Sequence, residues 1–254
     1  MVGVEDGIAM VTFERPPVNT IDGPSMVEMT EIFRSFADDR EVRVAILTAA
    51  GERAFIAGVD LKSIGGRGDD VSPTDLLDPG RIARNAMWSI TDCAVPVIAA
   101  VNGPAIGAGL AFAACCDIIV ASSRATFGTT EINVGLLGAS AHLALLVGRH
   151  KAREMFFTGE LVPAAVLHRI GAIREVVEPD QLLATTVELG RQLAAKSPLA
   201  LRLAKAAMNQ VEGLPLKDAY RIEQGYTDRL LRFEDAAEAR AAYLEKRDPV
   251  WKWR

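Results

Sequence analysis

Short runs of apolar residues alternate with stretches of helical spacing along the first half of the chain. The runs are rich in β-branched residues and predict strands over five ranges: 7–16, 42–49, 54–58, 96–102 and 117–122. Between these runs, apolar residues recur at helical spacing and predict helices over 24–39, 81–93 and 107–115. Alternating strands and helices are typical of βαβ units. We therefore expect an α/β fold with a parallel sheet and right-handed crossovers.

The second half of the chain has helical spacing almost throughout. Helices are predicted over seven ranges: 139–148, 151–157, 163–171, 179–197, 198–211, 216–233 and 234–247. One short run, 172–177, predicts a strand among them, and a segment rich in Gly, Asp and Pro, 64–80, predicts a loop. We expect a core domain of residues 1–195 followed by a helical region of residues 196–254.

Composition and charge exclude several classes of partner. The chain has 254 residues, half of them hydrophobic, which is enough for a large core. Its net charge is −5, and no run of Lys and Arg provides a basic face, so we expect no nucleic-acid partner. The N-terminus carries acidic residues and no apolar run is long enough to span a bilayer. We therefore expect a cytoplasmic protein without a membrane segment.

The chain contains three cysteines, Cys93, Cys115 and Cys116. They are too few for a disulfide scaffold, and no histidine lies near them at the spacing of a zinc site. We expect buried free thiols and no metal site.

Two junctions, 54–62 and 102–117, join a strand to a helix through small residues that leave the backbone uncovered. The amides of a first helical turn lack intrahelical partners and lie in the positive potential of the helix dipole. Such a turn binds an anion, or an oxygen that becomes negative only during a reaction. The glycines of the second junction, Gly103, Gly107 and Gly109, do not have dinucleotide or P-loop spacing. Close helix–sheet packing explains either junction alone; the two together favour paired backbone donors.

Five stretches of the chain occur in the order of a known family: RPPVNTID, AFIAGVDLKSI, PVIAAVNGPAIGAGLAFAACCDIIVAS, ATFGTTEINVGLLG and EDAAEARAAYLEKRDPVWK. Together they resemble the enoyl-CoA hydratase/isomerase (crotonase) superfamily, and the two ends are most similar to the carnitinyl-CoA dehydratase type. The resemblance implies a crotonase-like ββα spiral core with a C-terminal helical trimerisation region. It also implies an acyl-CoA substrate, no cofactor beyond the coenzyme A of that substrate, and a homo-oligomer, either a trimer or a dimer of trimers.

The resemblance further assigns the two backbone donors. Val59, after Gly58, and Ala108, after Gly107, match the family's oxyanion-hole positions, although the family more often has Gly at the second one. The segment from Ala57 to Lys62 would lie along the coenzyme A. Within it the resemblance implies contacts from five residues: Ala57, Gly58, Asp60, Leu61 and Lys62. The family also implies a substrate contact at Gly107. Lys62 is either a partner of the coenzyme A phosphates or a solvated surface lysine.

Hydratases of this family carry two glutamates, and this chain retains one of them. The first position corresponds to Ala111, which cannot transfer a proton, and the second corresponds to Glu131. One carboxylate suffices to move a proton from C2 to C4, so we favour Δ3,Δ2-enoyl-CoA isomerisation. For this role burial would have to raise the pKa of Glu131. From residue type alone, Glu131 is a surface carboxylate.

Other readings of the same residues remain open. Hydration or dehydration would need Glu131 to act with water or with a second group such as His142. An oxyanion hole alone also supports decarboxylation or thioester hydrolysis, and a non-catalytic acyl-CoA binder is the alternative outside enzymes. Asp117 and Ser140 have no partner visible in the sequence, and His142 is as well explained by a core or surface position. The aromatic tail, 249–254, either contacts a neighbour or frays.

Overall fold

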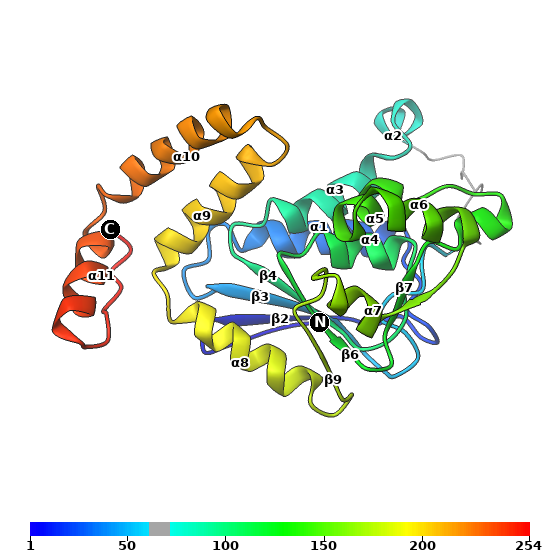
Figure 1. Cartoon of the computed structure of the whole chain (residues 1–254), viewed down its shortest axis with the longest axis horizontal. Helices are drawn as coiled ribbons and strands as arrows, with labels where there is room; N and C mark the ends of the chain where they lie inside the picture. Colours follow the sequence, from blue (N-terminus) through cyan, green and yellow to red (C-terminus); the bar gives the residue numbers. More distant parts are fainter. Residues whose placement is uncertain (61–71) are drawn as a thin grey trace.

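The computed structural model describes residues 1–60 and 72–254, so Leu61, Lys62 and the first part of the predicted loop lie outside the described residues. Its larger sheet has six strands in the order β1-β2-β3-β4-β6-β9 (Figure 1). The strands are β1 (Val2–Glu5), β2 (Ile8–Phe13), β3 (Val44–Ala49), β4 (Val97–Val101), β6 (Ile118–Ser122) and β9 (Glu175–Val177). All pairs except β1–β2 are parallel, which confirms the predicted parallel sheet.

Helices cover both faces of this sheet, which explains why its central strands are continuously apolar (Figure 1). Along β3, Ala45 and Leu47 belong to the cluster that contains α1 (Gly23–Ser35) and α3 (Arg81–Thr91). Val44 and Ile46 belong to the cluster with α8 (Leu182–Ala194) on the opposite face. Successive side chains of a strand point to opposite faces, so both sets are buried.

The sequence pattern missed β1. Asp6 and Gly7 both have positive φ, 53° and 79°, and connect β1 to β2 as a two-residue hairpin. This backbone conformation favours an Asp-Gly pair. All four residues of β1 are exposed, so its hydrophobic pattern does not mark it as a strand.

A second sheet of three short strands carries the site described below. Its order is β5 (Ala105–Ile106), β7 (Thr126–Gly128) and β8 (Val162–Pro163). The predicted strand over 54–58 is wrong: that segment makes only an isolated bridge from Ile56 to Ala105 of β5. The Phe55 amide donates to the Pro104 carbonyl and the Ala57 amide to the Asn19 carbonyl, so the segment forms no continuous ladder with one strand.

The predicted helices are confirmed to within a few residues at each end. The helices not yet named are α4 (Ala108–Ala114), α5 (Ser140–Val147), α6 (Arg149–Thr158), α7 (Ala164–Arg169), α9 (Pro198–Val211), α10 (Leu216–Leu230) and α11 (Glu234–Glu245). The predicted loop over 64–80 contains one further short helix, α2 (Pro73–Leu77), which Ser72 caps through a hydrogen bond from the Asp75 amide. No helix within residues 1–60 and 72–254 is long and apolar enough to cross a membrane.

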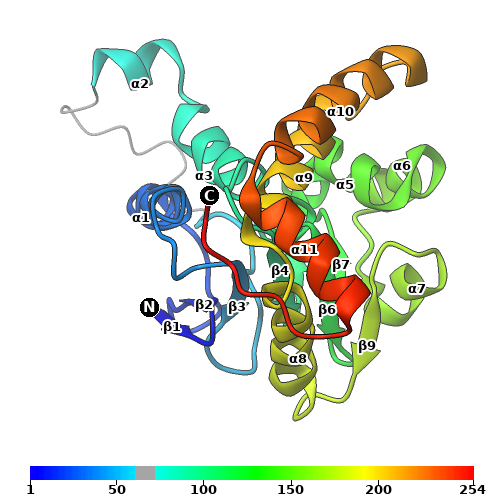
Figure 2. The same ribbon diagram turned by 90° about the vertical axis from the view of Figure 1, so that its left-hand side faces the viewer.

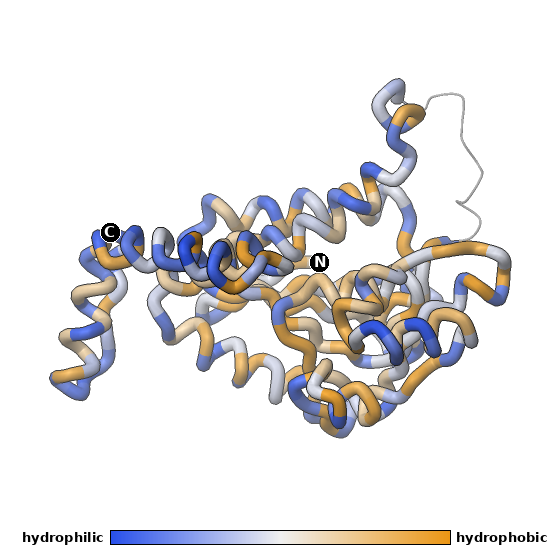
Figure 3. Tube along the Cα trace, turned by 45° about the horizontal axis from the view of Figure 1, so that its top comes forward, coloured by the Kyte–Doolittle hydropathy of each residue, from blue (hydrophilic) through white to orange (hydrophobic). Residues whose placement is uncertain are grey.

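Helices α10 and α11 extend away from the sheet (Figure 1). In Figure 3, polar and apolar segments alternate along α10 and α11, whereas apolar segments predominate among the strands. The aromatic tail runs back alongside α11 (Figure 2). Its amides at Lys252 and Trp253 donate to the Asp235 carboxylate, which is 1% exposed, and the Trp253 ring lies over Arg202 of α9. The tail is therefore held by its own chain.

Candidate active site

Two neighbouring parallel strands lead into the site. Strand β5 continues into Gly107 and α4, and β7 continues through Thr130 into the short 3-10 helix η2 (Glu131–Val134). The β5–β7 register pairs Ile106 with Gly128, and the Gly107 amide donates to the Gly128 carbonyl over 2.9 Å. This register places the start of α4 beside the start of η2. The side chain of Glu131 therefore reaches the first turn of α4.

The bridge between Val59 and Ile21 does not use the Val59 amide. Ile21 donates to the Gly58 carbonyl and accepts from the Asp60 amide, both over 2.9 Å. In a parallel bridge this pattern directs the Val59 N–H to the other side of the segment. Among residues 1–60 and 72–254, it donates to no protein acceptor.

The amide of Ala108 is free because Ala108 is the first residue of α4. Among the described residues no side chain caps this helix, and Gly107 precedes it with a φ of 54°. Gly109 brings the two donor segments together, because a Cβ at this position would overlap the Ile56 carbonyl oxygen. The two free amides thus come from segments in direct contact.

Val59, Ala108 and Glu131 line one cavity of about 430 Å³. Ala57 and Gly58 line it as well, whereas Gly107 lies beneath the Glu131 carboxyl group, where a Cβ would overlap Oε1. The other lining residues are mostly apolar: Met87, Ile106, Thr130, Val134, Leu136, Leu137, Gly138 and Ala139. In the described part of the chain, Glu131 is the ionisable side chain of this cavity.

Glu131 is held in an environment that disfavours its charge. The residue is half-buried, and its Oε2 atom is buried without a hydrogen-bond partner among the described residues. Burial raises the pKa of Glu131, and the amides of Glu131 and Thr130 offset part of this increase. A carboxyl group that lines a cavity, has a raised pKa and has an oxygen without a hydrogen-bond partner is suited to accept and return a proton.

Asp60 is engaged in an ion pair with Arg15. The Arg15 guanidinium lies 2.9 Å from Asp60 and 3.1 Å from Asp22, and it also donates to Thr20. These contacts raise the pKa of Arg15. The carboxylate of Asp60 thus fixes the segment that carries Val59.

The remaining candidates lie apart from this cavity. Ala111 is fully buried in α4. His142 lines a larger cavity of about 960 Å³, together with Asp117 and residues of α9, and burial lowers the pKa of its imidazole. Ser140 lines a third cavity. The pairing of His142 with Glu131 that hydration would use is therefore not found in the described structure.

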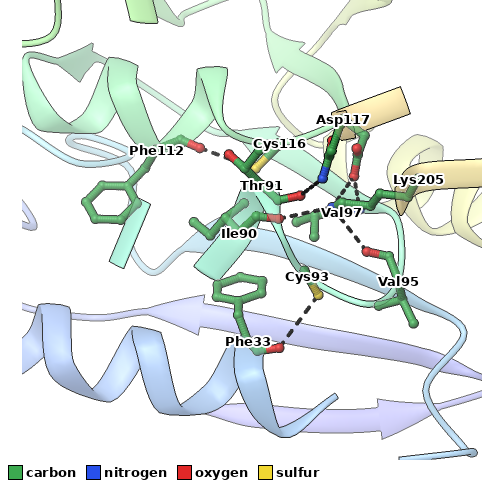
Figure 4. Close-up of polar contacts among 11 residues, drawn as sticks. Phe33, Ile90, Thr91, Cys93, Val95, Val97, Phe112, Cys116, Asp117 and Lys205 are labelled. Atoms are coloured by element: carbon green, nitrogen blue, oxygen red, sulfur yellow. Dashed lines mark hydrogen bonds and ion pairs between the residues drawn. The ribbon is translucent and has the colours of Figure 1, made fainter. Parts of the chain in front are cut away.

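Asp117 has partners that the sequence did not reveal (Figure 4). Its Oδ2 accepts from Lys205 Nζ and from the Val97 amide, each over 2.7 Å. Lys205 is buried and also donates to the carbonyls of Ile90 and Val95. This cluster joins α9 to the core and is structural.

The three cysteines are free and buried, as predicted. Burial raises the pKa of each thiol, to about 11 for Cys115. Cys93 and Cys116 donate to backbone carbonyls in the same region as the Asp117 cluster (Figure 4). These thiols are therefore inert packing residues.

Comparison with known families is decisive at this point, because the enoyl-CoA hydratase/isomerase model matches residues 3–254. This chain belongs to the enoyl-CoA hydratase/isomerase family. It is 40% identical over 242 residues to a (7aS)-7a-methyl-1,5-dioxo-2,3,5,6,7,7a-hexahydro-1H-indene-carboxyl-CoA hydrolase of Mycobacterium tuberculosis, covering 95% of this chain and 96% of that one. It is 37% identical over 254 residues to carnitinyl-CoA dehydratase of Escherichia coli, covering 97% and 95%.

Solved structures of the enoyl-CoA hydratase/isomerase family have the same fold. An enoyl-CoA hydratase from Bacillus anthracis has a TM-score of 0.90 at 27% identity, with 100% of this chain and 99% of that chain covered. An enoyl-CoA hydratase subunit from Geobacillus kaustophilus has a TM-score of 0.89 at 32% identity, covering 100% and 98%. The crotonase-like α/β core with C-terminal helices is thereby established, and the family acts on acyl-CoA thioesters.

Reasoning from the sequence missed part of the cavity wall. Met87 comes from α3, and Thr130 and Gly138 flank Glu131. Met87 follows the predicted loop over 64–80 by several residues. The helix that contains it has the apolar periodicity of any amphipathic helix. Nothing in the local pattern separates a cavity-lining position from a core position.

Proposed function

We propose that Val59 and Ala108 donate their backbone N–H groups to the thioester carbonyl oxygen of an acyl-CoA. The support is that Val59 and Ala108, whose amides have no acceptor among the described residues, both line the cavity that contains Glu131. Two such donors stabilise negative charge on the oxygen as an enolate forms, and each typically contributes about 2.7–4 kcal/mol to the transition state. The proton at C2 then becomes acidic enough for a carboxylate to remove.

We propose Δ3,Δ2-enoyl-CoA isomerisation with Glu131 as the base. Glu131 takes the C2 proton of a 3-enoyl-CoA, the electron pair moves into the enolate, and the same carboxyl group returns the proton at C4. The double bond then lies between C2 and C3. The observation that carries this proposal is that Glu131, whose Oε2 has no hydrogen-bond partner among the described residues, lines the same cavity as Val59 and Ala108. One carboxyl group performs both transfers.

A second candidate is a reaction that adds or removes water, because similar relatives are named as a hydrolase and as a carnitinyl-CoA dehydratase. In this chain Glu131 would activate the water. Ala111 stands where hydratases of the family have their other glutamate, and His142 lines a different cavity. Isomerisation needs neither group, and we therefore favour it.

Three assays on the purified protein separate these reactions. Isomerisation of a 3-enoyl-CoA creates the absorbance of a conjugated thioester, and hydration of a 2-enoyl-CoA removes it. Thioester hydrolysis releases a free thiol from either substrate. We expect the rate of isomerisation to exceed the rates of hydration and of thioester hydrolysis by about tenfold or more. Measurable acyl-CoA binding without any of the three reactions would instead indicate a non-catalytic binder.

Glu131→Gln is expected to lower kcat by at least about 10²-fold, since general base catalysis typically contributes 10²–10⁴. The amide keeps the size of the side chain, so acyl-CoA affinity measured by calorimetry is expected to stay within about twofold. Glu160→Gln, an exposed carboxylate outside the cavity, is the matched control. Normal turnover in Glu131→Gln would remove Glu131 from the mechanism.

A further inference from the structure

A second cavity adjoins the candidate active site through one residue. A groove of about 620 Å³ lies between α5 and α6, and Leu137 lines both this groove and the cavity of Glu131. The side chain of Leu137 is 80% exposed, so little packing holds it in place as a wall. An acyl group that begins at Val59 and Ala108 can therefore continue past Leu137 into the groove.

The groove combines apolar walls with two arginines. Ala144, Ala152, Phe156 and Phe157 supply its apolar surface, and Arg149 and Arg153 lie one turn apart on α6. Within residues 1–60 and 72–254, neither guanidinium has a hydrogen bond or an ion pair.

The two arginines do not stabilise the helix that carries them. Cations at positions i and i+4 repel each other across one turn. Arg149 also lies in the first turn of α6, where the helix dipole disfavours a positive charge, and this turn contains no acidic residue. The guanidinium groups of Arg149 and Arg153 therefore have no acidic partner within the described structure. An anion in the groove would pair with them.

We propose that this groove holds the distal part of the acyl group and that Arg149 and Arg153 bind a carboxylate at its end. The substrate class is then an acyl-CoA whose acyl group is apolar in the middle and carries a second, terminal carboxylate. Guanidinium groups pair with a carboxylate through charge-assisted hydrogen bonds, and the apolar walls cover the carbon atoms between the two ends. This inference rests on the proposed function, which places the thioester end beside Glu131.

The test compares two acyl-CoA ligands of equal length, suberoyl-CoA with a terminal carboxylate and octanoyl-CoA without one. Both are saturated, so binding is measured by calorimetry without turnover. The test variant is Arg149→Gln/Arg153→Gln. The control is Lys151→Gln on the same helix, because Lys151 lines neither cavity and makes only a surface pair with Glu154.

We expect the double variant to weaken suberoyl-CoA binding about fivefold, which is the range of exposed charge pairs. Octanoyl-CoA binding is expected to change less than twofold, and Lys151→Gln is expected to leave both affinities unchanged. Leu137→Trp narrows the passage between the two cavities. It is expected to weaken both eight-carbon ligands while butyryl-CoA, whose acyl chain is four carbons shorter, binds as before.

Three outcomes would overturn the inference while leaving the proposed function intact. In the first, the double variant weakens suberoyl-CoA and octanoyl-CoA binding equally. In the second, Leu137→Trp leaves the affinity for octanoyl-CoA unchanged. In the third, the double variant loses its assembly in light scattering and shows no ligand-specific effect. The last outcome would show that the groove is covered by a second copy of the chain. Failure of the wild-type protein to bind any of the three acyl-CoA ligands would instead refute the proposed function.

Discussion

At the scale of single residues, the candidate site depends more on the backbone than on side chains. The small residues on either side of Val59 and Ala108 expose two amides, and Glu131 adds the acid–base group. Gly107 and Gly109 are required because a Cβ at either position would overlap Glu131 or Ile56. The proposed chemistry therefore depends on where the chain passes as much as on which side chains it carries.

Ala108→Pro removes one proposed donor with little change in the fold. Proline is well tolerated at the first position of a helix, and the preceding Gly107 adapts its backbone freely. We expect kcat to fall about 10²–10³-fold, the cost of losing one oxyanion-hole donor. Glu234→Pro is the control, because Glu234 is the first residue of α11 and is remote from the cavity. Wild-type turnover in Ala108→Pro would refute the role of this amide.

The raised pKa of Glu131 predicts the pH dependence of both activity and stability. The base must be ionised, so kcat/KM is expected to rise with pH along a limb displaced above 4.5, the ordinary value for this group. The folded state holds this proton more tightly than the unfolded state. The free energy of unfolding therefore falls as pH rises from 4.5 through the raised pKa.

Profiles of kcat/KM against pH check the first expectation, and urea titrations check the second. Both are measured from pH 4 upward, at steps of about one pH unit. Glu131→Gln is expected to lose this contribution to the pH dependence of stability. An acid limb at or below 4.5 in the wild-type protein would contradict the assigned burial effect.

At this scale, motifs named positions whose catalytic roles stay predictions. Val59, Ala108 and Glu131 were chosen by family resemblance, and the structure brings them to one cavity. Sequence reasoning failed for Asp117, whose partner Lys205 lies 88 positions later in the chain. Contacts over such separations are set by the tertiary fold, and a local pattern of residues does not encode them.

At the scale of elements, α9 is attached to the core by the buried Lys205. Its ammonium group satisfies Asp117 and the carbonyls of Ile90 and Val95 (Figure 4). Lys205→Met keeps the side-chain length but leaves all three acceptors without this donor. We expect the free energy of unfolding to fall by about 3 kcal/mol, the lower end of the range for breaking a buried ion pair, because Asp117 is 31% exposed.

Urea denaturation of Lys205→Met measures this loss. Lys151→Met breaks a surface pair with Glu154 and serves as the control, with an expected change below about 1 kcal/mol. Equal midpoints for Lys205→Met and the wild-type protein would show that α9 does not depend on this contact.

Long elements were predictable and short ones were not. Helices such as α8 and α9 span several turns, so their apolar periodicity is well sampled. Strands β5 and β8 have two residues each, which is too short for any period to emerge. Their positions depend on pairing with β7, and the segment 54–58 was misassigned because its apolar residues pack without forming a ladder.

At the scale of the whole molecule, α10 and α11 leave large apolar side chains exposed within the part of the chain that the structure describes. None of the 15 residues of α10 is buried, and Leu216 is 83% exposed. Tyr243 and Leu244 of α11 are exposed as well. Helix α10 is amphipathic, and an uncovered apolar face of such a helix is typical of a protein contact, so we expect other copies of the chain to cover it.

Light scattering is expected to give a mass of about three or six times 27.3 kDa for the wild-type protein. Leu216→Asp places a charge on the uncovered face, so the mass is expected to shift toward that of one chain. Leu183→Asp on α8, which is 50% exposed, is the control. A wild-type mass equal to one chain would contradict the expectation.

The route of the chain through the site also bears on how new activities arise. Val59 and Ala108 are held by buried strands and bridges, whereas the segment from Thr130 to Ala139 supplies the carboxyl group and much of the acyl wall from a largely exposed surface. Exchange of that surface segment between paralogues would alter the reaction without dismantling the scaffold. The segments that carry Val59 and Ala108 would then change more slowly in evolution than the segment from Thr130 to Ala139.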